Sequence, residues 1–484
     1  MSELSRSAKA LLKKTDDNSE KEDKPIFQSY IETSDYILEQ IQGATDATSA
    51  NSAREVRFIK YDKKLGTTEE VEDFENENKL YKPINNELTY SISLSGGVQE
   101  YNTISNLIKR IRDFYNYNFQ VPAKFEQILP YLCLFTWVYE KFPFVPYINF
   151  VGLTSTGKTT AMEVFGSLCY KTLDVSGSIT MASIFRTTTI WRGTLLLDEF
   201  DNIGEEARQM ISFLKSGVSD RAVLRVEGDK VREVKAYLVK CPKIFTSEKP
   251  VTDAGLQSRI FVIPMEKNKR KVPLYRLNKY KKETEELKRM LLLWRLRNLN
   301  KIDFEDIEFG FEELSGLESR VQQVITPIYY LADDETKKNI LIFAQEQQKE
   351  TLRQRREAEE GIIFTIIYDL YNENQELMLS EITAEFNKKA IPFKLWTNTK
   401  VSNVIRKILG FETERVGHNN ITMVIPDKNK LEDLCQYYGL TPLAPIAVVA
   451  PVANGESKQI KVDQEKLLDQ IEETQKESSD NLPF

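Results

Sequence analysis

The pattern of apolar and polar residues changes several times along the 484-residue chain. Between residues 147 and 264, short apolar runs alternate with helical stretches, and the runs are YINFVG, GTLLLDEF, YLVKCPKIFTS and RIFVIP. Such alternation predicts an α/β fold with a parallel sheet. Within residues 104–140, the segments ISNLIKRIRDFY and FEQILPYLCLFTWVYEKF have apolar residues at helical spacing and predict two leading helices.

The flanking regions follow other patterns. From residue 56 to about residue 98, VRFIKY and LTYSISLSGGV alternate as strands do, and residues 273–358 have the pattern of helices throughout. We therefore divide the chain into a disordered or linker N-terminal region (1–55), a small β-rich domain (56–103), an α/β core with its leading helices (104–265), a helical lid or linker (266–358), a winged-helix domain (359–441) and a disordered acidic tail (442–484).

Three helical patterns and one hairpin pattern predict the winged helix. The helices are EEGIIFTIIYDLYNEN, LSEITAEFNKKA with Ser380 as its cap, and TNTKVSNVIRKILGF, opened by Thr397 or Asn398. The hairpin is ETERVGHNNITMVIP, with its turn at residues 417–420. Helix-turn-helix modules insert one helix into the major groove of DNA. DNA binding is therefore the first interpretation, and a winged helix used for protein contacts is the alternative.

Charge narrows the choice of partner. A net charge of −7 excludes a protein that binds nucleic acid through overall positive charge, although it permits a local basic patch. Residues 388–411 form such a patch, because they contain no acid and six basic residues: Lys388, Lys389, Lys394, Lys400, Arg406 and Lys407. This is the electrostatic footprint of phosphate binding. We predict DNA contacts at Lys400, Arg406, Lys407 and Arg415, with Trp396 as a further candidate.

Cysteine and histidine usage argues against zinc and against secretion. The four cysteines are scattered singly, no CxxC pair occurs, and His418 is the only histidine, so we expect no structural zinc site. Unpaired thiols suit a reducing compartment, which predicts a cytoplasmic protein. The first residues lack the apolar segment of a signal peptide, and the longest apolar stretch, residues 128–138, is too short to span a bilayer. We expect no membrane partner.

The first candidate site follows the apolar strand YINFV. The stretch GLTSTGKT, residues 152–159, is a full GxxxxGK[ST] motif between that strand and a helical pattern starting at Lys158. Its glycines let backbone N–H groups converge on phosphate at a helix N-terminus. We expect Lys158 to reach the β- and γ-phosphates of ATP and Thr159 to hold Mg²⁺. The predicted nucleotide-binding residues of this loop are Gly152, Ser155, Thr156, Gly157, Lys158, Thr159 and Thr160.

A second strand, TLLL, delivers two acids at its carboxyl end. We expect Asp198 to hold Mg²⁺ and Glu199 to polarise the attacking water, which makes Glu199, with Lys158, a candidate catalytic residue. The alternative is a core strand that ends in two solvated acids. The upstream phosphate-binding loop, at the expected distance, favours the metal site.

Two further strands carry candidate residues. The strand KIFTS ends in Thr246 and Ser247, and one of these hydroxyls is a candidate sensor of the γ-phosphate or of the water, unless this is a plain strand end. Arg259 closes a short helix just before the strand IFVIP, where it cannot easily reach its own nucleotide. It would fit the γ-phosphate of a neighbouring subunit as an arginine finger, and a surface arginine is the alternative.

Between the acids and the sensor strand, RAVLRVEGDKVREVKAYLV predicts a β-hairpin. Gly228 and Asp229 form a plausible tight turn, and Lys230 and Arg232 would lie at or near the tip. Positive charges at such a tip suit a nucleic-acid contact, although any exposed hairpin can carry one or two charges.

These motifs, in this order, resemble those of the AAA+ ATPases in the clade of superfamily 3 viral helicases and minichromosome-maintenance helicases. The fuller stretch is similar to ATPases encoded by plasmids, phages and integrated elements. The resemblance covers residues 129–265 well and continues more loosely to residue 331, through SGSITMASIFR, GTLLLDEFD, LKSGVSDRAVLRVEG, CPKIFTSEKP and GLQSRIFVIPM.

The resemblance carries further expectations. It implies ATP and Mg²⁺ as cofactors, a homo-oligomeric ring that is most simply a hexamer, and a primase or other replication protein as a partner. It implies that Arg320 is a second nucleotide sensor, with a helix-surface arginine as the alternative. It also implies that the hairpin around Lys230 and Arg232 projects into the ring channel and grips DNA.

Two functions remain open from the sequence. The first is an ATP-driven DNA helicase or translocase that serves replication of a mobile element. The second is an AAA+ switch that binds DNA and loads or remodels a replication or transposition partner without unwinding. The predicted channel hairpin favours the motor. A primase active site would need a separate cluster of acids, and often zinc, and the sequence offers neither.

Overall fold

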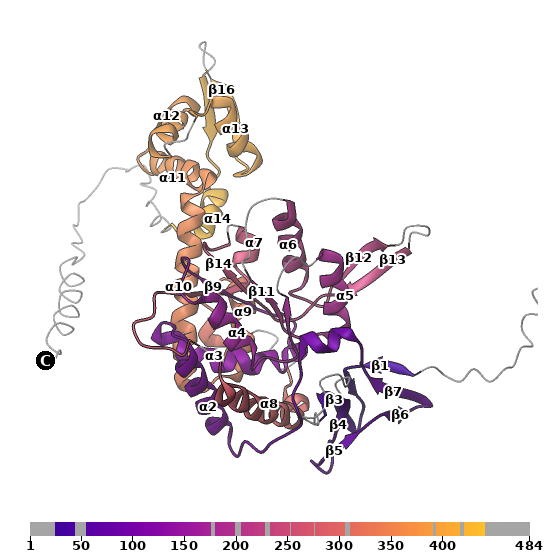
Figure 1. The fold of residues 1–484 in the computed structure, drawn as a ribbon. Coiled ribbons are helices and arrows are strands. Elements are labelled where there is room, and N and C mark those ends of the chain that lie inside the picture. The colour runs from indigo at the N-terminus through magenta and orange to yellow at the C-terminus, as the bar shows by residue number, and fades with distance from the viewer. Residues whose placement is uncertain are drawn as a thin grey trace, which may run out of the picture. The chain divides into compact units, whose positions relative to one another are not determined.

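The computed structural model describes residues 25–43, 55–175, 180–198, 205–227, 233–251, 253–274, 276–304, 310–390, 394–416 and 421–440. The chain forms two compact units, Met1–Arg355 and Arg356–Phe484. The first unit holds the central sheet and the N-terminal strands, and the second is a small unit of helices and one hairpin (Figure 1).

A six-stranded sheet lies at the centre of the first unit, in the order β15-β9-β14-β11-β10-β8. Its strands are β8 (Ile92–Ser93), β9 (Tyr147–Val151), β10 (Thr172–Val175), β11 (Leu195–Leu197), β14 (Lys243–Ser247) and β15 (Ile260–Pro264). All neighbours run parallel except β8, which is antiparallel to β10. Every residue of β9 and β14 is buried, as expected for strands covered on both faces. The predicted mixed α/β fold with a mostly parallel sheet is confirmed.

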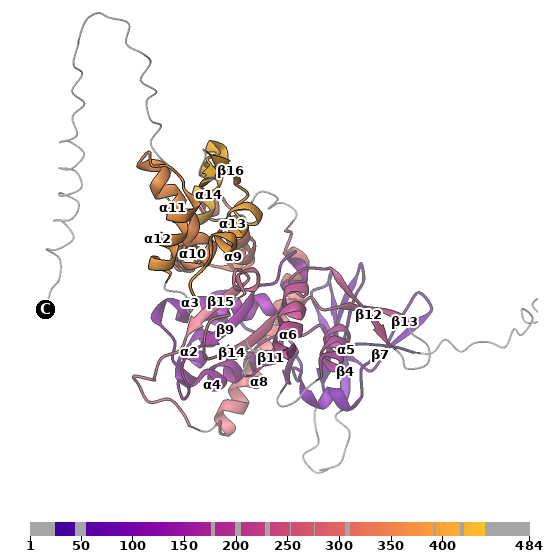
Figure 2. The ribbon, with the colours of Figure 1, turned by 90° about the horizontal axis from the view of Figure 1, so that it is seen from above.

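Helices pack around this sheet, as both views show (Figure 2). They are α2 (Ile104–Asn118), α3 (Ala123–Thr136), α4 (Lys158–Gly166), α5 (Met181–Trp191), α6 (Glu205–Ser216), α7 (Ala254–Gln257), α8 (Asn278–Asn298), α9 (Ser319–Leu331) and α10 (Asp334–Glu357). The leading helices expected before the sheet and the helices expected after it are present. Helix α2 packs on α3 and α8, and α3 packs on α9, so the helices on either side of the sheet in sequence are neighbours in space.

The N-terminal strands begin earlier than the sequence indicated. They are β1 (Ile26–Gln28), β2 (Tyr30–Glu32), β3 (Tyr36–Gln42), β4 (Val56–Asp62), β5 (Thr68–Val71), β6 (Phe74–Asn76) and β7 (Lys79–Pro83), arranged as the sheets β2-β3-β4-β5 and β1-β7-β6. The prediction that residues 1–55 are disordered or linker is therefore wrong for residues 26–42. Strand β3 is buried on both faces, and its polar residues Glu39 and Gln40 are buried with the apolar ones, so YILEQIQ does not show the alternation of a half-exposed strand.

Strand β3 belongs to two hydrophobic cores at once. On one face, Ile37 and Ile41 join the large core that contains the central sheet and its helices. On the other face, Leu38 packs with Ile31 and Phe58 in a small core of the N-terminal sheets. Because the first core is shared, the N-terminal strands are part of the same compact unit as the central sheet.

The segment LTYSISLSGGV, predicted as a strand, is mostly something else. Residues Glu87–Ser91 form a 3₁₀ helix, and only Ile92–Ser93 extend as β8. Asn86 explains the difference: its side chain accepts a hydrogen bond from Leu88 N, and the Thr89 hydroxyl accepts one from Asn86 N. Such a reciprocal cap stabilises a helical turn over an extended strand.

The second unit contains the predicted order of three helices and a hairpin. These are α11 (Glu359–Asn372), α12 (Leu379–Lys389), α13 (Asn398–Lys407), β16 (Glu412–Val416) and β17 (Ile421–Ile425), and α14 (Lys428–Tyr438) follows. Thr397 caps α13 by accepting from Lys400 N. The prediction that Ser380 caps α12 is wrong, because Met378 holds the cap position and its bridge to Met423 keeps the chain extended up to that point.

No helix among the residues the structure describes is both long and apolar enough to cross a membrane.

Candidate nucleotide site

Strand order brings the predicted metal and sensor residues together. Strand β14 lies between β9, which precedes the phosphate-binding loop, and β11, which precedes Asp198. Phe245 pairs with Leu197, so Thr246 comes opposite Asp198. The Thr246 hydroxyl donates to Asp198 Oδ1 at 2.7 Å, and the Thr159 hydroxyl donates to the same oxygen at 3.1 Å. Two predicted residues from separate segments, Thr159 and Thr246, thus converge on the carboxylate of a third, Asp198.

The phosphate-binding loop has the backbone that its glycines predict. Gly157 has φ of +85°, and Ser155 has φ of +66°, a conformation that is strained for a residue other than glycine. A Cβ at Gly152 would lie 2.4 Å from the carbonyl oxygen of Met265, so only glycine fits there. Helix α4 then begins at Lys158 with no side chain capping it. Its first N–H groups are available to an anion, which the helix dipole also favours.

Lys158 is held over this loop. Its Nζ donates to the carbonyl oxygens of Gly152 at 2.7 Å and Leu153 at 2.9 Å. Thr154 donates to Glu248 Oε1 at 2.6 Å, which ties the loop to the end of β14. The ammonium group thus lies at the mouth of the loop, where a phosphate chain would replace its two carbonyl partners.

The oxygens around Asp198 fit a magnesium ion. Mg²⁺ prefers oxygen ligands, and it is commonly held by one or two carboxylates together with the phosphates of a substrate. Thr159 and Asp198 supply such oxygens at the end of the loop that would hold the phosphates. Within the described residues, no group of three or more histidine, cysteine or acidic side chains gathers to form a metal site of another kind.

Asp174 is an acid that the sequence reasoning missed. It lies on β10 beside β11, at the position paired with Leu196. Partial burial and the nearby charge of Asp198 raise the pKa of its carboxyl group. The strand is only four residues long, so the signal in the sequence was limited to one acid at the end of KTLDV.

The two sensor candidates divide their roles. Ser247 exchanges hydrogen bonds with the side chain of Asn149 on β9, at 2.9 and 3.2 Å, and both side chains are buried. Thr246 instead turns toward Asp198. Of the two residues left open by the sequence, Thr246 is therefore the one that faces the metal site. Glu199, the predicted catalytic acid, lies outside the described residues.

Arg259 lies at the opposite end of the sheet. It directly precedes β15, and its carbonyl oxygen accepts a hydrogen bond from Tyr147 N at the start of β9, whereas the phosphate-binding loop follows the end of β9. Five strand residues rise about 16 Å. Arg259 is thus separated from its own phosphate-binding loop by the full length of the strand.

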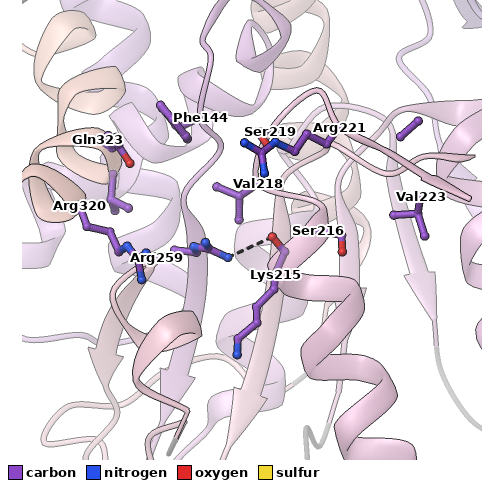
Figure 3. A pocket seen from close by; sticks show the side chains of 12 residues that line it. Phe144, Lys215, Ser216, Val218, Ser219, Arg221, Val223, Arg259, Arg320 and Gln323 are labelled. Atoms are coloured by element: carbon purple, nitrogen blue, oxygen red, sulfur yellow. Dashed lines mark hydrogen bonds between the residues drawn. The ribbon is translucent and has the colours of Figure 1, made fainter. Parts of the chain in front are cut away.

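Arg259 and Arg320 line one cationic cavity of about 620 Å³ (Figure 3). Lys215 and Arg221 also line it, and its lining contains no acid among the described residues, although Lys215 pairs with nearby Asp253 at 2.7 Å. Arg259 Nη1 donates to the carbonyl oxygen of Lys215 at 3.0 Å. Burial, followed by the charge of Arg320, lowers the pKa of Arg259. Two arginines in one cavity, whose described lining contains no acid, make this cavity a candidate site for an anion.

Arg320 is the second arginine of this cavity. The sequence suggested a nucleotide sensor without indicating whose nucleotide it would contact. In the structure, Arg320 is an exposed residue of α9 and lines the same cavity as Arg259, and its role as a nucleotide sensor stays a prediction. Lys215 and Arg221 were missed altogether, since each is an ordinary surface cation when read from the sequence alone.

The predicted hairpin is present as β12 (Ala222–Glu227) and β13 (Glu233–Leu238), paired antiparallel. Lys230 and Arg232, the predicted DNA contacts, lie outside the described residues.

In the second unit, Lys400, Arg406, Lys407 and Arg415 are all exposed. Trp396 is buried against Phe386, with the Lys400 ammonium 3.4 Å from its ring centroid, so Trp396 is a core residue that positions Lys400.

No protein-family model matches the chain, and no curated protein does. Solved structures are similar to it, and three of them are described here. The C-terminal region of NrS-1, in its apo form, has 13% identity, covers 74% of this chain and 82% of that chain, and has a TM-score of 0.38. SCCmec type IV Cch, described as an active helicase, has 12% identity, covers 90% of this chain and 84% of that chain, and has a TM-score of 0.43. The JCV helicase has 15% identity, covers 51% of this chain and 61% of that chain, and has a TM-score of 0.24. The likeness is partial and concerns the fold alone.

Proposed function

We propose that this chain is a ring-forming AAA+ ATPase that works as an ATP-dependent DNA helicase or translocase in the replication of a mobile element. One observation carries the proposal. The residues suited to bind ATP with Mg²⁺ lie at the carboxyl edge of the sheet, while a cationic cavity containing Arg259 and Arg320 lies at the amino edge. One chain thus presents the two complementary halves of a nucleotide site on opposite sides.

Opposite halves require a second subunit to complete each site. Arg259 cannot cross the sheet to its own phosphate-binding loop, because the length of β9 separates them. Repeated head-to-tail contacts of this kind close into a ring when the rotation between subunits allows it. A hexamer is the simplest such ring for the AAA+ clade that the motifs resemble.

The chain's residues would divide the work of ATP hydrolysis as follows. The N-terminus of α4 and Lys158 bind and orient the phosphates, and Thr159 and Asp198 hold Mg²⁺, which neutralises charge on the phosphates. Thr246 orients the Asp198 carboxylate and lies where it can sense the γ-phosphate. Glu199 polarises the attacking water. Arg259, from the neighbour, stabilises the charge that develops as the γ-phosphate leaves.

DNA contacts are proposed at two places. In sequence, Lys230 and Arg232 lie between β12 and β13. We propose that this hairpin enters the channel of the ring and that the two residues contact DNA there. The second unit is proposed to be a winged helix that binds duplex DNA through Lys400, Arg406 and Lys407 on α13 and Arg415 on β16. Lys400 and Lys407 are seven residues apart on one helix, so they share a face. Their exposure supports phosphate contacts.

Two measurements on the full chain test this proposal. Imaging with ATP and Mg²⁺ should reveal rings, and a forked duplex should be unwound only when hydrolysable ATP is present. A chain that forms rings and hydrolyses ATP, yet separates strands on forks of neither polarity, would be the AAA+ switch that loads or remodels a partner. A chain without ATPase activity would contradict both functions.

A further inference from the structure

The two strands of the hairpin have faces of opposite character. In the antiparallel register, Ala222 pairs with Leu238, Leu224 with Ala236, and Val226 with Val234. Directly paired residues project from the same face of a two-stranded sheet. One face of the hairpin therefore carries six residues, all of them apolar.

This apolar face is uncovered in the single chain. Leu224 is 67% exposed, Val226 is 62% exposed and Val234 is 66% exposed. Among the described residues, neither strand pairs with any strand other than its hairpin partner. The hairpin also extends away from the central sheet beside α5 (Figure 1).

The opposite face explains how the hairpin is held. Tyr237 is buried there, with its ring 5.8 Å from that of Phe185 on α5. The Arg225 guanidinium lies 4.6 Å from the centroid of the same Phe185 ring. An isolated two-stranded hairpin is at best marginally stable in water, so one packed face on α5 is a minimal anchor. A contiguous apolar face beside it marks an interaction site.

The chemistry of the face argues against DNA as its occupant. Side-chain contacts to a phosphate backbone come from charged or polar residues, and unpaired bases are bound by stacking on aromatic rings. The six residues of this face include neither type. Any DNA contact of the hairpin therefore belongs to its tip, and the body of the hairpin requires an apolar protein partner.

The position of the hairpin identifies that partner. Arg221, Ala222 and Val223, at the base of β12, line the same cavity as Arg259 and Arg320. That cavity is the side of the chain which, in the proposed function, meets the nucleotide of a neighbour. A subunit docked on the cavity would lie directly beside the base of the hairpin.

We propose that the apolar face of β12–β13 is a subunit contact, occupied by a second copy of this chain when the ring assembles. The inference rests on the proposed function, because the ring supplies the neighbour. The contact is heterologous, because neighbouring subunits of a ring are related head to tail. It holds the hairpins in register around the channel and leaves only their tips for DNA.

Cysteine labelling provides a direct test, because all four native cysteines are buried. The variant Leu224→Cys places one accessible thiol on the face, and Leu65→Cys places a matched thiol at an exposed leucine in the turn between β4 and β5. Each full-length variant is treated with a maleimide, without DNA, with and without ATP and Mg²⁺. At a chain concentration about tenfold above the assembly Kd, labelling at position 224 should slow about tenfold on assembly. Labelling at position 65 should not change.

A second pair of variants tests the energetic role of the face. Val226→Thr with Val234→Thr keeps the shape of both side chains and adds hydroxyls to a cross-strand pair of the face. Val416→Thr with Ile421→Thr changes a cross-strand pair of similar type on the hairpin of the second unit. The first variant should raise the concentration needed for ring assembly, measured by mass photometry, and the second should leave it unchanged.

Each outcome has a distinct meaning. If wild-type rings form and the thiol at position 224 reacts as fast in them as in single chains, this proposal is wrong and the proposed function stands. If protection appears below the assembly concentration, the face is covered within its own chain. If the labelling is repeated with DNA under conditions in which mass photometry detects only single chains, and protection then appears, the face binds DNA. Either of these results overturns the subunit contact. If no assembly forms, the ring and the contact fail together.

Discussion

Glu39 on β3 and Arg295 on α8 form a buried ion pair, with 2.6 Å between Oε1 and Nε, although 256 positions separate them in sequence. Lys171 joins them, with its Nζ 2.8 Å from Glu39 Oε2, and Tyr170 donates its hydroxyl to the same carboxylate. Arg295 also pairs with Glu140. The charges of two carboxylates and two cations thus balance, in a cluster that connects the N-terminal sheet, the residues just before β10 and helix α8.

We predict that Glu39→Gln destabilises the first unit by about 3–5 kcal/mol, because the change leaves buried Arg295 and Lys171 without their shared counter-charge. Chemical denaturation of the full chain, followed by tryptophan fluorescence, would measure this loss. The control is Asp35→Asn, which breaks an exposed pair with Lys64 and should change the midpoint little. Equal effects of the two variants would contradict a structural role for the buried cluster.

The same carboxylate makes stability depend on pH. Burial by itself would raise the pKa of Glu39, but the charges of Arg295 and Lys171 outweigh it and hold that pKa below its ordinary value of 4.5. In the window just below pH 4.5, the unfolded chain therefore binds the proton that the folded chain does not, and stability falls as the pH falls. We predict a shallower loss of stability below pH 4.5 in Glu39→Gln than in the wild type, measured as denaturation midpoints against pH.

The shared contact on Asp198 gives a prediction for catalysis. Thr246→Val keeps the shape of the side chain and removes its hydrogen bond to Asp198. A hydrogen bond to a charged group contributes about 1.5–3 kcal/mol, so kcat for ATP should fall by about 10- to 150-fold if all of that energy acts in the transition state. Steady-state ATPase assays would measure this fall in kcat. Ser247→Ala, which alters the neighbouring contact with Asn149, should cost less. The reverse order would make Ser247 the sensor.

Two further variants separate binding from hydrolysis. Lys158→Ala should abolish ATP turnover by removing the cation at the phosphate-binding loop, whereas Glu199→Gln should still bind ATP and hydrolyse it slowly, because only polarisation of the water is lost. Binding is measured with a fluorescent ATP analogue and turnover by phosphate release. Normal turnover in Glu199→Gln would remove Glu199 from the mechanism.

Arg259 should act on the nucleotide of a neighbouring subunit. Rings of Arg259→Ala chains lack the finger at every site, and rings of Lys158→Ala chains lack the phosphate-binding cation. Mixed rings contain some interfaces with both groups intact, so mixing the two inactive variants should restore part of the ATPase activity. The measurement is turnover against mixing ratio, with mixed assemblies verified by mass photometry of size-tagged chains. Absence of recovery at every ratio would require a role within one subunit.

Local motifs were easier to predict than the contacts that join distant segments. The loop around Lys158 and the strand before Asp198 were identifiable because each motif is contiguous and the phosphate chemistry dictates its spacing. Thr246 meets Asp198 because β14 lies between β9 and β11 in the sheet. The local sequence pattern predicts each strand but does not predict the order of the strands in the sheet.

Residues 26–42 were misread for a related reason. In β3, the buried charge of Glu39 looks like the polar position of a surface strand or linker, since its partners Lys171 and Arg295 are remote in sequence. The cavity at Arg259 likewise joins cations from α6, α9 and the base of β12, and no single segment reveals it.

The last prediction separates a motor from a switch. If the hairpin tip grips DNA in the channel, Lys230→Ala should abolish strand separation, and the ratio of DNA-stimulated to basal ATP hydrolysis should fall to near one. The reason is positional: the sequence predicts Lys230 between β12 and β13, away from the phosphate-binding loop, so we expect its charge to act on DNA and not on the phosphates. Unwinding of a forked duplex is measured beside ATPase activity with and without DNA.

Arg406→Ala with Lys407→Ala provides the matched control in the second unit, where both residues are exposed. These changes should weaken duplex binding and reduce the slope of log K against log salt by roughly one unit for each lost phosphate contact. Because these changes affect only the binding of duplex DNA by α13, they should spare unwinding once the ring is loaded. If Lys230→Ala unwinds as fast as the wild type while the α13 variant does not unwind even when loaded, then α13 moves the DNA and the hairpin serves assembly alone.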